Sequence, residues 1–328
     1  MTRSHNAWAR LLSPLALAAA VAFCPASQAR DYPDRPITFV VPSSAGGSPD
    51  TIGRLIAARL ADALKQPVVI DNLSGASGII GTERVARAKP DGYTVLYGFN
   101  QLVTMNPHLF TKLPYVPEKD LEPVVLVAKL GYVWVAAPSF GANTVDEWLR
   151  LAKAQPGKLT FASNGPGSSA HLGGELVNQL AKVEMLHVPY RSNGVPPDLM
   201  SGRVDLKIEP SSLAIPLIKA GRLKALAVTG AKRMDALPDV PALAEFLPGY
   251  DITGWQAVWV PAGTPQPVVA RLNAEINRII ALPEIQARLA EMGAEVVGGA
   301  PDVLTRTTRS ESKMWRDLLL ARNIKPES

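Results

Sequence analysis

Residues 37–60 read ITFVVPSSAGGSPDTIGRLIAARL, and this stretch decides the fold. Its first five residues are β-branched or aromatic and lie between Pro36 and Pro42, which indicates a short buried strand. From Ser48, which can cap a helix, a proline in the first turn and apolar residues at helical spacing indicate a helix with one apolar face. A strand, a short loop and a helix in this order predict an α/β fold.

The loop between this strand and helix consists of small residues, Ser43, Ser44, Ala45, Gly46 and Gly47. Glycine lets the backbone come close to a ligand, and the free N–H groups at the start of a helix favour an anion. The helix dipole contributes only about 0.3–1 kcal/mol, so several N–H bonds would have to supply most of the binding. A tight β–α turn, with glycines needed only for packing, explains the same residues, and the loop matches neither a P-loop nor a dinucleotide fingerprint.

The same order of strand, loop and helix occurs again in the second half of the chain. Residues 159–162 predict a strand, and the helix that follows has one apolar face made of Leu172, Leu176, Val177 and Leu180. The loop between them offers hydroxyl, amide and N–H donors on Ser163, Asn164, Gly165, Gly167, Ser168 and Ser169. We therefore expect two similar binding loops, one in each half of the chain.

Strands and helices alternate through most of the sequence, as in a fold with a largely parallel sheet. The strands predicted at 124–128 and 133–137 are candidates for the crossing from one domain into another. The helices predicted at 283–292 and 301–322 have no strands to alternate with, so we expect them to return and pack on the first domain. We predict two domains, residues 30–130 plus 254–328 and residues 131–253.

Residues 1–29 have the pattern of a secretory signal peptide rather than of a folded element. Arg3 and Arg10 provide the positive charge, and the apolar run from Leu11 to Phe23 is too short to span a bilayer comfortably. The small residue Ala29 suits signal peptidase, so we predict cleavage after it and export of the mature chain. A retained membrane anchor is the alternative, which the short apolar run disfavours.

Composition excludes several classes of function. The single cysteine, Cys24, lies inside the predicted signal peptide behind a large residue, so we expect no lipid anchor, disulfide or catalytic thiol in the mature chain. The chain carries a formal net charge of +5, of which Arg3 and Arg10 contribute two, and it has no run of Lys or Arg. A nucleic-acid surface is therefore not expected.

The histidines and serines leave an enzyme as the alternative function. A secreted hydrolase could use Ser168 or Ser169 as its nucleophile and His171 as its base. The sequence has no nucleophile-elbow motif, however, and neighbouring positions at a helix start point their side chains in different directions. His171 and His187 lack the spacing of a metal site, and a lone histidine on a helix or strand is more often structural. We therefore favour hydroxyl and amide donors over catalysis.

Short motifs occur in a fixed order along nearly the whole predicted mature chain. They are YPDRPI at 32–37, VP at 41–42 with GG at 46–47 and Asp50, GIIGT at 78–82, KPDGYT at 89–94, GPGSS at 165–169 with His171 and Leu172, HVPY at 187–190, LPDVP at 237–241 and PAGTP at 261–265. Each motif is weak alone. Together they make the chain resemble the periplasmic solute receptors of tripartite tricarboxylate transporters, known as the Bug or TctC type.

The resemblance implies a two-domain α/β fold of the type II periplasmic-binding-protein class, a Venus flytrap with the ligand cleft between its lobes. It implies a small carboxylate ligand, such as a di- or tricarboxylate, an acidic amino acid or an aromatic acid, held by the two loops. By position, Asp50 and Gln101 are further candidate ligand residues. The implied partners are the integral-membrane permease subunits of the transporter, and we expect a periplasmic monomer without enzyme activity, cofactor, metal or nucleic acid.

Some residues leave the identity of the carboxylate open. Arg191 is a candidate for pairing a second ligand charge because its guanidinium matches a carboxylate, but it could equally be a surface residue bonded to Glu209 or water. The family's first loop usually has an aromatic residue and prolines where this chain has residues 43–45. Charges at 207–209 replace residues that are usually apolar or amide-bearing. Trp255 could pack in the core or form a wall of the cleft.

Overall fold

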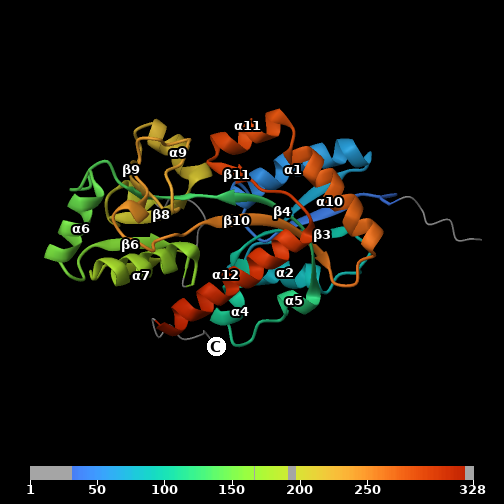
Figure 1. Ribbon diagram of the computed structural model, residues 1–328, viewed down its shortest axis with the longest axis horizontal. Helices are drawn as coiled ribbons and strands as arrows, with labels where there is room; N and C mark the ends of the chain where they lie inside the picture. Colours follow the sequence, from blue (N-terminus) through green and yellow to red (C-terminus); the bar gives the residue numbers. More distant parts are fainter. Residues whose placement is uncertain (1–31, 166, 191–196, 322–328) are drawn as a thin grey trace, which may run out of the picture. The chain divides into compact units, whose positions relative to one another are not determined.

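The computed structural model describes residues 32–165, 167–190 and 197–321 (Figure 1). Residues 32–34 belong to the N-terminal segment, and the folded unit begins at Arg35. This unit contains two mixed β-sheets with helices, so the prediction of an α/β fold is confirmed. Residues 1–31, with the predicted signal peptide and cleavage site, lie outside the described residues.

The first sheet has six strands in the order β11-β4-β10-β3-β1-β2. The strands are β1 (Ile37–Val41), β2 (Val68–Asn72), β3 (Thr94–Phe99), β4 (Leu121–Leu130), β10 (Gly254–Pro261) and β11 (Ala294–Val296). β1 is parallel to β2 and β3, whereas β10 is antiparallel to β3 and β4. The carboxyl ends of β1, β2 and β3 therefore lie at one edge of this sheet.

The helices in the same parts of the chain are α1 (Ser48–Leu64), α2 (Ile79–Ala86), α3 (Gln101–Thr104), α4 (Asn106–Leu109), α5 (Pro117–Asp120), α10 (Gln266–Ile280), α11 (Pro283–Glu291) and α12 (Pro301–Ala321). A single 3₁₀ turn at Ala76–Gly78 precedes α2. The helix α2 therefore begins directly after this turn.

The second sheet has five strands in the order β7-β6-β8-β5-β9. The strands are β5 (Tyr132–Ala136), β6 (Thr160–Ser163), β7 (Leu186–Pro189), β8 (Leu206–Pro210) and β9 (Lys224–Val228). Its helices are α6 (Val145–Ala154), α7 (Ser169–Ala181), α8 (Pro197–Met200) and α9 (Ser211–Lys219), with a 3₁₀ turn at Leu243–Glu245. β6 is parallel to both of its neighbours, so the loop after β6 leaves the carboxyl edge of this sheet.

The stretch that begins at residue 37 folds largely as its pattern predicts. β1 is almost completely buried, and α1 buries the apolar side chains Ile52, Ile56, Leu60 and Leu64. The N-cap is Gly47 rather than Ser48. The hydroxyl of Ser48 instead accepts a hydrogen bond of 3.1 Å from the side chain of Gln256, because Ser48 is already inside the first turn.

Thr229 bridges the two crossings between the sheets. Gly131 separates β4 from β5, and residues 251–253 lead from the second sheet back into β10. The N–H of Thr229 donates to the carbonyl of Tyr132 (3.0 Å), and its hydroxyl donates to the carbonyl of Ile252 (2.6 Å). The crossings therefore lie side by side, as a paired hinge requires.

The C-terminal helix α12 packs against β4, α3 and α4 (Figure 1). Leu304, near its start, belongs to a hydrophobic cluster of the first sheet. Trp315 and Leu319, near its end, belong to the cluster that contains Trp134 and Phe161 of the second sheet. The terminal helix α12 therefore packs beside the first sheet as expected, and its last turns carry apolar side chains that also reach the core of the second sheet.

The cap of α6 provides a test of the local structure. The hydroxyl of Thr144 accepts a hydrogen bond of 3.2 Å from the N–H of Glu147, whose carboxylate accepts one of 2.7 Å from the N–H of Asn143. Thr144→Ala is expected to lower the free energy of unfolding by about 1 kcal/mol in urea denaturation. Thr144→Ser should retain most of the stability, and an alanine variant as stable as the parent would contradict the capping role.

Candidate functional site

A cavity of about 920 Å³ is lined by segments from both sheets. The first sheet contributes residues after β1, β2 and β3 and the start of β10, and the second contributes residues after β6, β7 and β8. Eight of the sequence-predicted site residues line it, namely Ser43, Ser44, Gly47, Gln101, Asn164, Gly165, Ser168 and Ser169. The two predicted loops, at 43–47 and 163–169, therefore face the same cavity.

Five other predicted site residues are described by the structure and do not line the cavity. Ser163, Gly167, Ala45 and Gly46 lie within the two loops but outside the lining. Asp50 also lies outside it, and Arg191 falls outside the described residues. The structure thus brings the loops together without assigning every loop residue a place at the cavity wall.

Asp50 supports the first loop from behind. Its carboxylate accepts hydrogen bonds from the N–H of Gly46 (2.8 Å) and the amide of Asn72 (3.0 Å), and it lies 2.9 Å from the guanidinium of Arg54. Burial alone would raise the pKa of Asp50, but the hydrogen bonds from Arg54, Gly46 and Asn72 hold it below its usual value. Asp50 is therefore ionised and bonded within the first loop, and its predicted contact with a ligand stays a prediction.

Some backbone donors of the first loop are already used inside the protein. The N–H of Ser43 donates to Val41 and that of Gly47 donates to Ser44. Among the described residues, no acceptor is in hydrogen-bond reach of the N–H groups of Ser44 and Ser48, and both residues line the cavity. The hydroxyl of Ser43 is also buried without a hydrogen-bond partner in the described structure. Because that hydroxyl is buried, the first loop offers a ligand the N–H groups of Ser44 and Ser48.

A chain of hydrogen bonds adds the hydroxyl of Ser48 to these donors. The hydroxyl of Tyr97 donates to the side-chain oxygen of Gln256 (2.9 Å), and the amide nitrogen of Gln256 donates to the hydroxyl oxygen of Ser48 (3.1 Å). Because this oxygen already accepts a hydrogen bond, the hydrogen of Ser48 is left to point elsewhere. Ser48 lines the cavity, so it can donate through both its hydroxyl and its N–H.

The second loop divides its donors in the same way. The N–H of Gly165 donates to the hydroxyl of Ser163 (3.0 Å), and that of Ser168 donates to the carbonyl of Gly165 (3.3 Å). Within the described chain, the N–H groups of Ser169 and Ala170 have no acceptor in reach, and both residues line the cavity. The start of α7 thus presents two backbone donors that the described residues leave unbonded.

A pair of stacked histidines holds the second loop in place. The rings of His171 and His187 stack with centroids 4.0 Å apart. Nδ1 of His171 accepts from the N–H of Gly167 (2.9 Å), and Nε2 of His187 lies 2.6 Å from the hydroxyl of Ser163. Burial lowers the pKa of His171, and burial together with the neighbouring ring lowers the pKa of His187 to about 4. Both rings are therefore neutral at pH 7.

The two serines considered as nucleophiles of a hydrolase, Ser168 and Ser169, have no imidazole base. The hydroxyl of Ser168 donates to the carbonyl of Gly165 (2.8 Å) and accepts from the N–H of His171 (3.3 Å). The hydroxyl of Ser169 lies 4.0 Å from the sulfur of Met105. Since neither hydroxyl is bonded to an imidazole nitrogen, the geometry does not form a catalytic pair. The described residues also contain no cluster of His, Cys, Asp or Glu that could hold a metal ion.

The charged residues of β8 point away from the cavity. Lys207 and Glu209 are fully buried and paired with each other. Ile208 and Pro210 alternate with them along the strand and line the cavity. Burial raises the pKa of Glu209, and the charge of Lys207 opposes that shift. The unusual charges at 207–209 therefore belong to the opposite face of the sheet, and among the described lining residues no side chain is charged.

Sequence reasoning missed three parts of the site. Residues 74–78 line the cavity, although they were not among the predicted site residues. This loop follows β2, and β2 is parallel to β1, so its position at the same sheet edge could have been inferred. Tyr132 and Gln256 also line the cavity. No local motif marks them, because their position depends on how the second sheet meets the first.

Glu311 on α12 connects several of these elements. Its Oε1 accepts from Asn100 (2.7 Å), Thr104 (3.2 Å) and the indole of Trp315 (2.8 Å), and its Oε2 accepts from the indole of Trp255. Burial raises the pKa of Glu311, and these four hydrogen bonds oppose that shift. Trp255 and Asn100 line the cavity. Glu311 on α12, which is far from both in the sequence, therefore holds part of the cavity wall in place.

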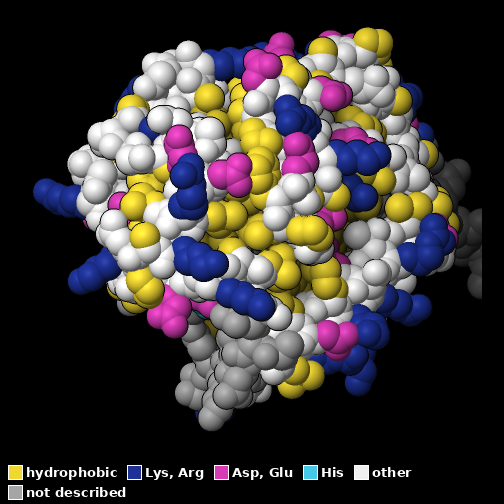
Figure 2. All heavy atoms as spheres, turned by 60° about the vertical axis from the view of Figure 1, so that its left-hand side comes forward, with side chains coloured by type: hydrophobic (Ala, Val, Ile, Leu, Met, Phe, Trp, Pro, Cys, Tyr) yellow, Lys and Arg dark blue, Asp and Glu magenta, His cyan; other side chains and the backbone are white. Residues whose placement is uncertain are grey.

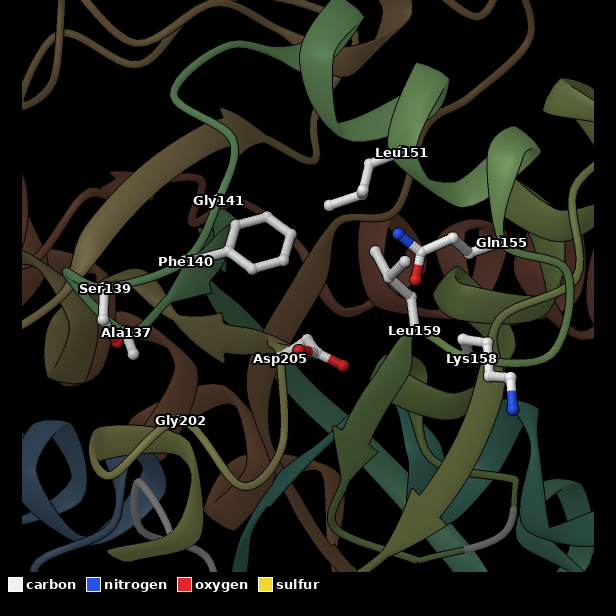
Figure 3. A pocket seen from close by; sticks show the side chains of 10 residues that line it. All are labelled: Ala137, Ser139, Phe140, Gly141, Leu151, Gln155, Lys158, Leu159, Gly202 and Asp205. Atoms are coloured by element: carbon white, nitrogen blue, oxygen red, sulfur yellow. The ribbon is translucent and has the colours of Figure 1, made fainter.

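A second, smaller cavity of about 220 Å³ lies beside β5, α6 and β6 (Figure 3). Figure 3 shows the side chains of Phe140, Leu151 and Leu159 around it, with the Lys158 amine pointing away. One oxygen of Asp205 accepts bonds of 2.8 Å from both the N–H and the hydroxyl of Thr160. This cavity contains no residue of either predicted loop, so we assign the candidate site to the larger one.

One face of the molecule carries its apolar side chains in the centre. Figure 2 shows hydrophobic side chains gathered in the middle of that face, with Lys, Arg, Asp and Glu side chains around them.

No helix in the described part of the chain is both long and apolar enough to cross a membrane.

Comparison with known proteins shows relatives that share the fold described above. A family model described as "Tripartite tricarboxylate transporter family receptor" matches residues 52–324. The R. palustris protein Rpa4515, solved with adipate, is 35% identical with a TM-score of 0.86, covering 90% of this chain and 100% of that one. The periplasmic binding protein BugD is 33% identical with a TM-score of 0.83 and the same two coverages.

A third solved structure extends the comparison. MatC from Rhodopseudomonas palustris, with bound malate, is 34% identical with a TM-score of 0.81, covering 88% of this chain and 100% of that one. These similarities confirm the expected α/β fold of a periplasmic binding protein.

The histidine pair predicts a pH dependence of stability. His187 has a folded-state pKa of about 4, below its usual value of about 6.5, so the unfolded chain binds more protons in this window. The free energy of unfolding should therefore fall as the pH is lowered from about 6.5 towards 4, and urea denaturation at a series of pH values would measure it. His187→Gln should flatten this slope. An unchanged slope would contradict the assignment.

Proposed function

The chain belongs to the family of tripartite tricarboxylate transporter receptors, and on that basis we propose that it captures a small carboxylate in the 920 Å³ cavity. Adipate and malate are present in two of the similar structures, so carboxylates are the ligands to expect here. A di- or tricarboxylate, an acidic amino acid and an aromatic acid all belong to this chemical class. Binding without turnover is the activity proposed.

The observation that carries this proposal is the set of free donors at two helix starts. Ser44 and Ser48 present N–H groups from α1 and its loop, and Ser169 and Ala170 present theirs from α7. A buried carboxylate left without partners costs several kcal/mol, so its oxygens need such donors. Hydrogen bonds to a charged group contribute about 1.5–3 kcal/mol each. A few of them meet the roughly −8 kcal/mol of a micromolar receptor.

The donors come from both sheets, which couples binding to closure. A ligand bound to one loop set lacks partners on its other side until the second set approaches. Only the closed arrangement then supplies all the hydrogen bonds. The ligand therefore binds the closed state more tightly than the open state and shifts the equilibrium towards it. We propose that residues 30–130 with 254–328 form one lobe and residues 131–253 the other, with the crossings at Gly131 and 251–253 as the hinge.

The cellular setting follows from the family and the N-terminal pattern. We propose that the precursor is cleaved after Ala29 and that the mature receptor acts as a monomer in the periplasm. Its partners would be the integral-membrane permease subunits of a tripartite transporter, which accept the ligand from the closed receptor. The N-terminal pattern of Arg3, Arg10 and the apolar run supports export.

A ligand screen tests the proposal. The mature protein should gain thermal stability with at least one acid from a panel of mono-, di- and tricarboxylates, acidic amino acids and aromatic acids, because binding to the folded state alone raises its stability. The matched neutral amides should give no gain, since the site offers donors and an amide NH₂ would face them. Stabilisation by a sugar or a cation with none by any carboxylate would overturn the proposal.

A further inference from the structure

A third loop, residues 74–78, lines the cavity together with the loop at 43–47. It follows β2, which pairs in parallel with β1, so the two loops leave neighbouring strands at the same edge of the first sheet. The side-chain amide of Asn72, at the end of β2, donates to the carbonyl of Ser43 (3.3 Å). The first sheet therefore presents two adjacent loops to the cavity.

The backbone conformation of this third loop is unusual. Four successive residues have positive φ, namely Gly75, Ala76, Ser77 and Gly78, with values of 45° at Ala76 and 54° at Ser77. Glycine adopts this region freely, but a residue with a Cβ adopts it at a cost in free energy. Such backbone persists only where the surrounding structure holds it, and it is concentrated at active sites and ligand-binding segments.

Buried residues outside the cavity lining hold the loop in this conformation. The side-chain amide of Asn106 donates to the carbonyl of Ser77 (3.1 Å), and the hydroxyl of Thr82 donates to the carbonyl of Gly78 (2.9 Å). A Cβ at Gly78 would lie 2.4 Å from Cδ2 of Leu102. The side-chain oxygen of Asn106 is buried without a partner in the described structure, which is unfavourable, so its bond to Ser77 is kept at a cost to stability.

The backbone donors of the third loop are not used within the described chain. The N–H of Gly78 donates to the carbonyl of Gly75 (2.9 Å), but no described acceptor is in hydrogen-bond reach of the N–H groups of Ser74, Gly75, Ala76 and Ser77. These four residues are exposed and line the cavity, so a ligand can reach them. Water can satisfy their N–H groups until an oxygen of the ligand takes its place.

We propose that residues 74–78 form a third ligand-binding loop, which binds a second acid group of the ligand while the other two loops bind the first. This inference rests on the proposed function, since it concerns the same cavity. The two helix starts offer four N–H groups, and a carboxylate accepts at about four positions, so one acid group can use all of them. The donors of the third loop therefore require a second acceptor group.

Calorimetric titration of the mature protein with pairs of acids tests the second acid group. Succinate with butyrate, and adipate with hexanoate, differ only in that a carboxylate replaces the terminal methyl group. In at least one pair the diacid should bind about tenfold or more tightly than the monoacid. Equal binding within both pairs, or tighter binding of the monoacids, would overturn the inference and leave the proposed function intact. If none of the four acids binds, the inference is overturned, and the ligand screen described above decides the proposed function separately.

Loop variants test where the second acid group binds. Ser74→Pro removes one N–H and one hydroxyl at a position whose φ is not positive, and Ser77→Ala removes a second hydroxyl. The double variant should bind the preferred diacid about tenfold or more weakly and the matched monoacid as the parent does. Ser139→Ala is the control, because this exposed serine lines the smaller cavity, and it should leave both affinities unchanged. Equal losses for the two acids, or no loss for the diacid, would overturn the assignment.

Two further variants keep the test decisive if the proline disturbs folding. Ser74→Ala combined with Ser77→Ala removes both hydroxyls without a proline and should reduce the preference for the diacid about threefold or more. Ala76→Gly keeps its N–H and adopts positive φ freely, so the midpoint of urea denaturation should rise while the preference for the diacid is retained. An unchanged preference in the double alanine variant would contradict the proposal.

Discussion

An acid group can leave water only when each of its oxygens gains a hydrogen bond. The described structure provides hydrogen-bond donors for such a group at the starts of two helices. In the loop before α1 and at the start of α7, the N–H groups of Ser44, Ser48, Ser169 and Ala170 have no acceptor among the described residues. The neighbouring N–H groups are bonded internally and give the loops their shape. Some N–H groups of the site therefore stabilise the loops, and the others remain to bind a ligand.

The residues behind the loops make this division possible. Asp50 holds the N–H of Gly46 at the start of α1, and its own negative charge is balanced by Arg54 one turn later. Without that balance, a carboxylate at the same helix start would meet a like charge. In the second loop two neutral histidines perform the equivalent task, with His171 accepting from Gly167. Glu311 extends the support to the wall, from a helix that contacts the cores of both sheets.

The sequence allowed the fold and both loops to be predicted, because each depends on local patterns. The strand, loop and helix order at residues 37–60 and again after residue 159 indicates parallel β–α units, whose loops lie at the carboxyl edges of their sheets. The roles of individual loop residues could not be predicted in the same way. Whether an N–H group remains unbonded depends on which nearby side chain accepts its hydrogen bond. The carboxylate of Asp50, for example, accepts the hydrogen bond of the Gly46 N–H.

Residues far apart in the sequence were hardest to foresee. Glu311 lies in an amphipathic helix among exposed charges, and no motif distinguishes it from its neighbours. Its role arises because α12 returns past α3 and β10 and meets Trp255 and Asn100 there. Tyr132 reaches the cavity because the crossing at Gly131 brings the second sheet beside the first. Both positions follow from tertiary packing rather than from spacing.

A crystal structure of the mature protein with its bound acid would test the central claim most directly. The account predicts carboxylate oxygens within about 2.7–3.2 Å of backbone nitrogens from both helix starts, Ser44 or Ser48 on one side and Ser169 or Ala170 on the other. An acid group held by the donors of one side only, or placed outside this cavity, would contradict it.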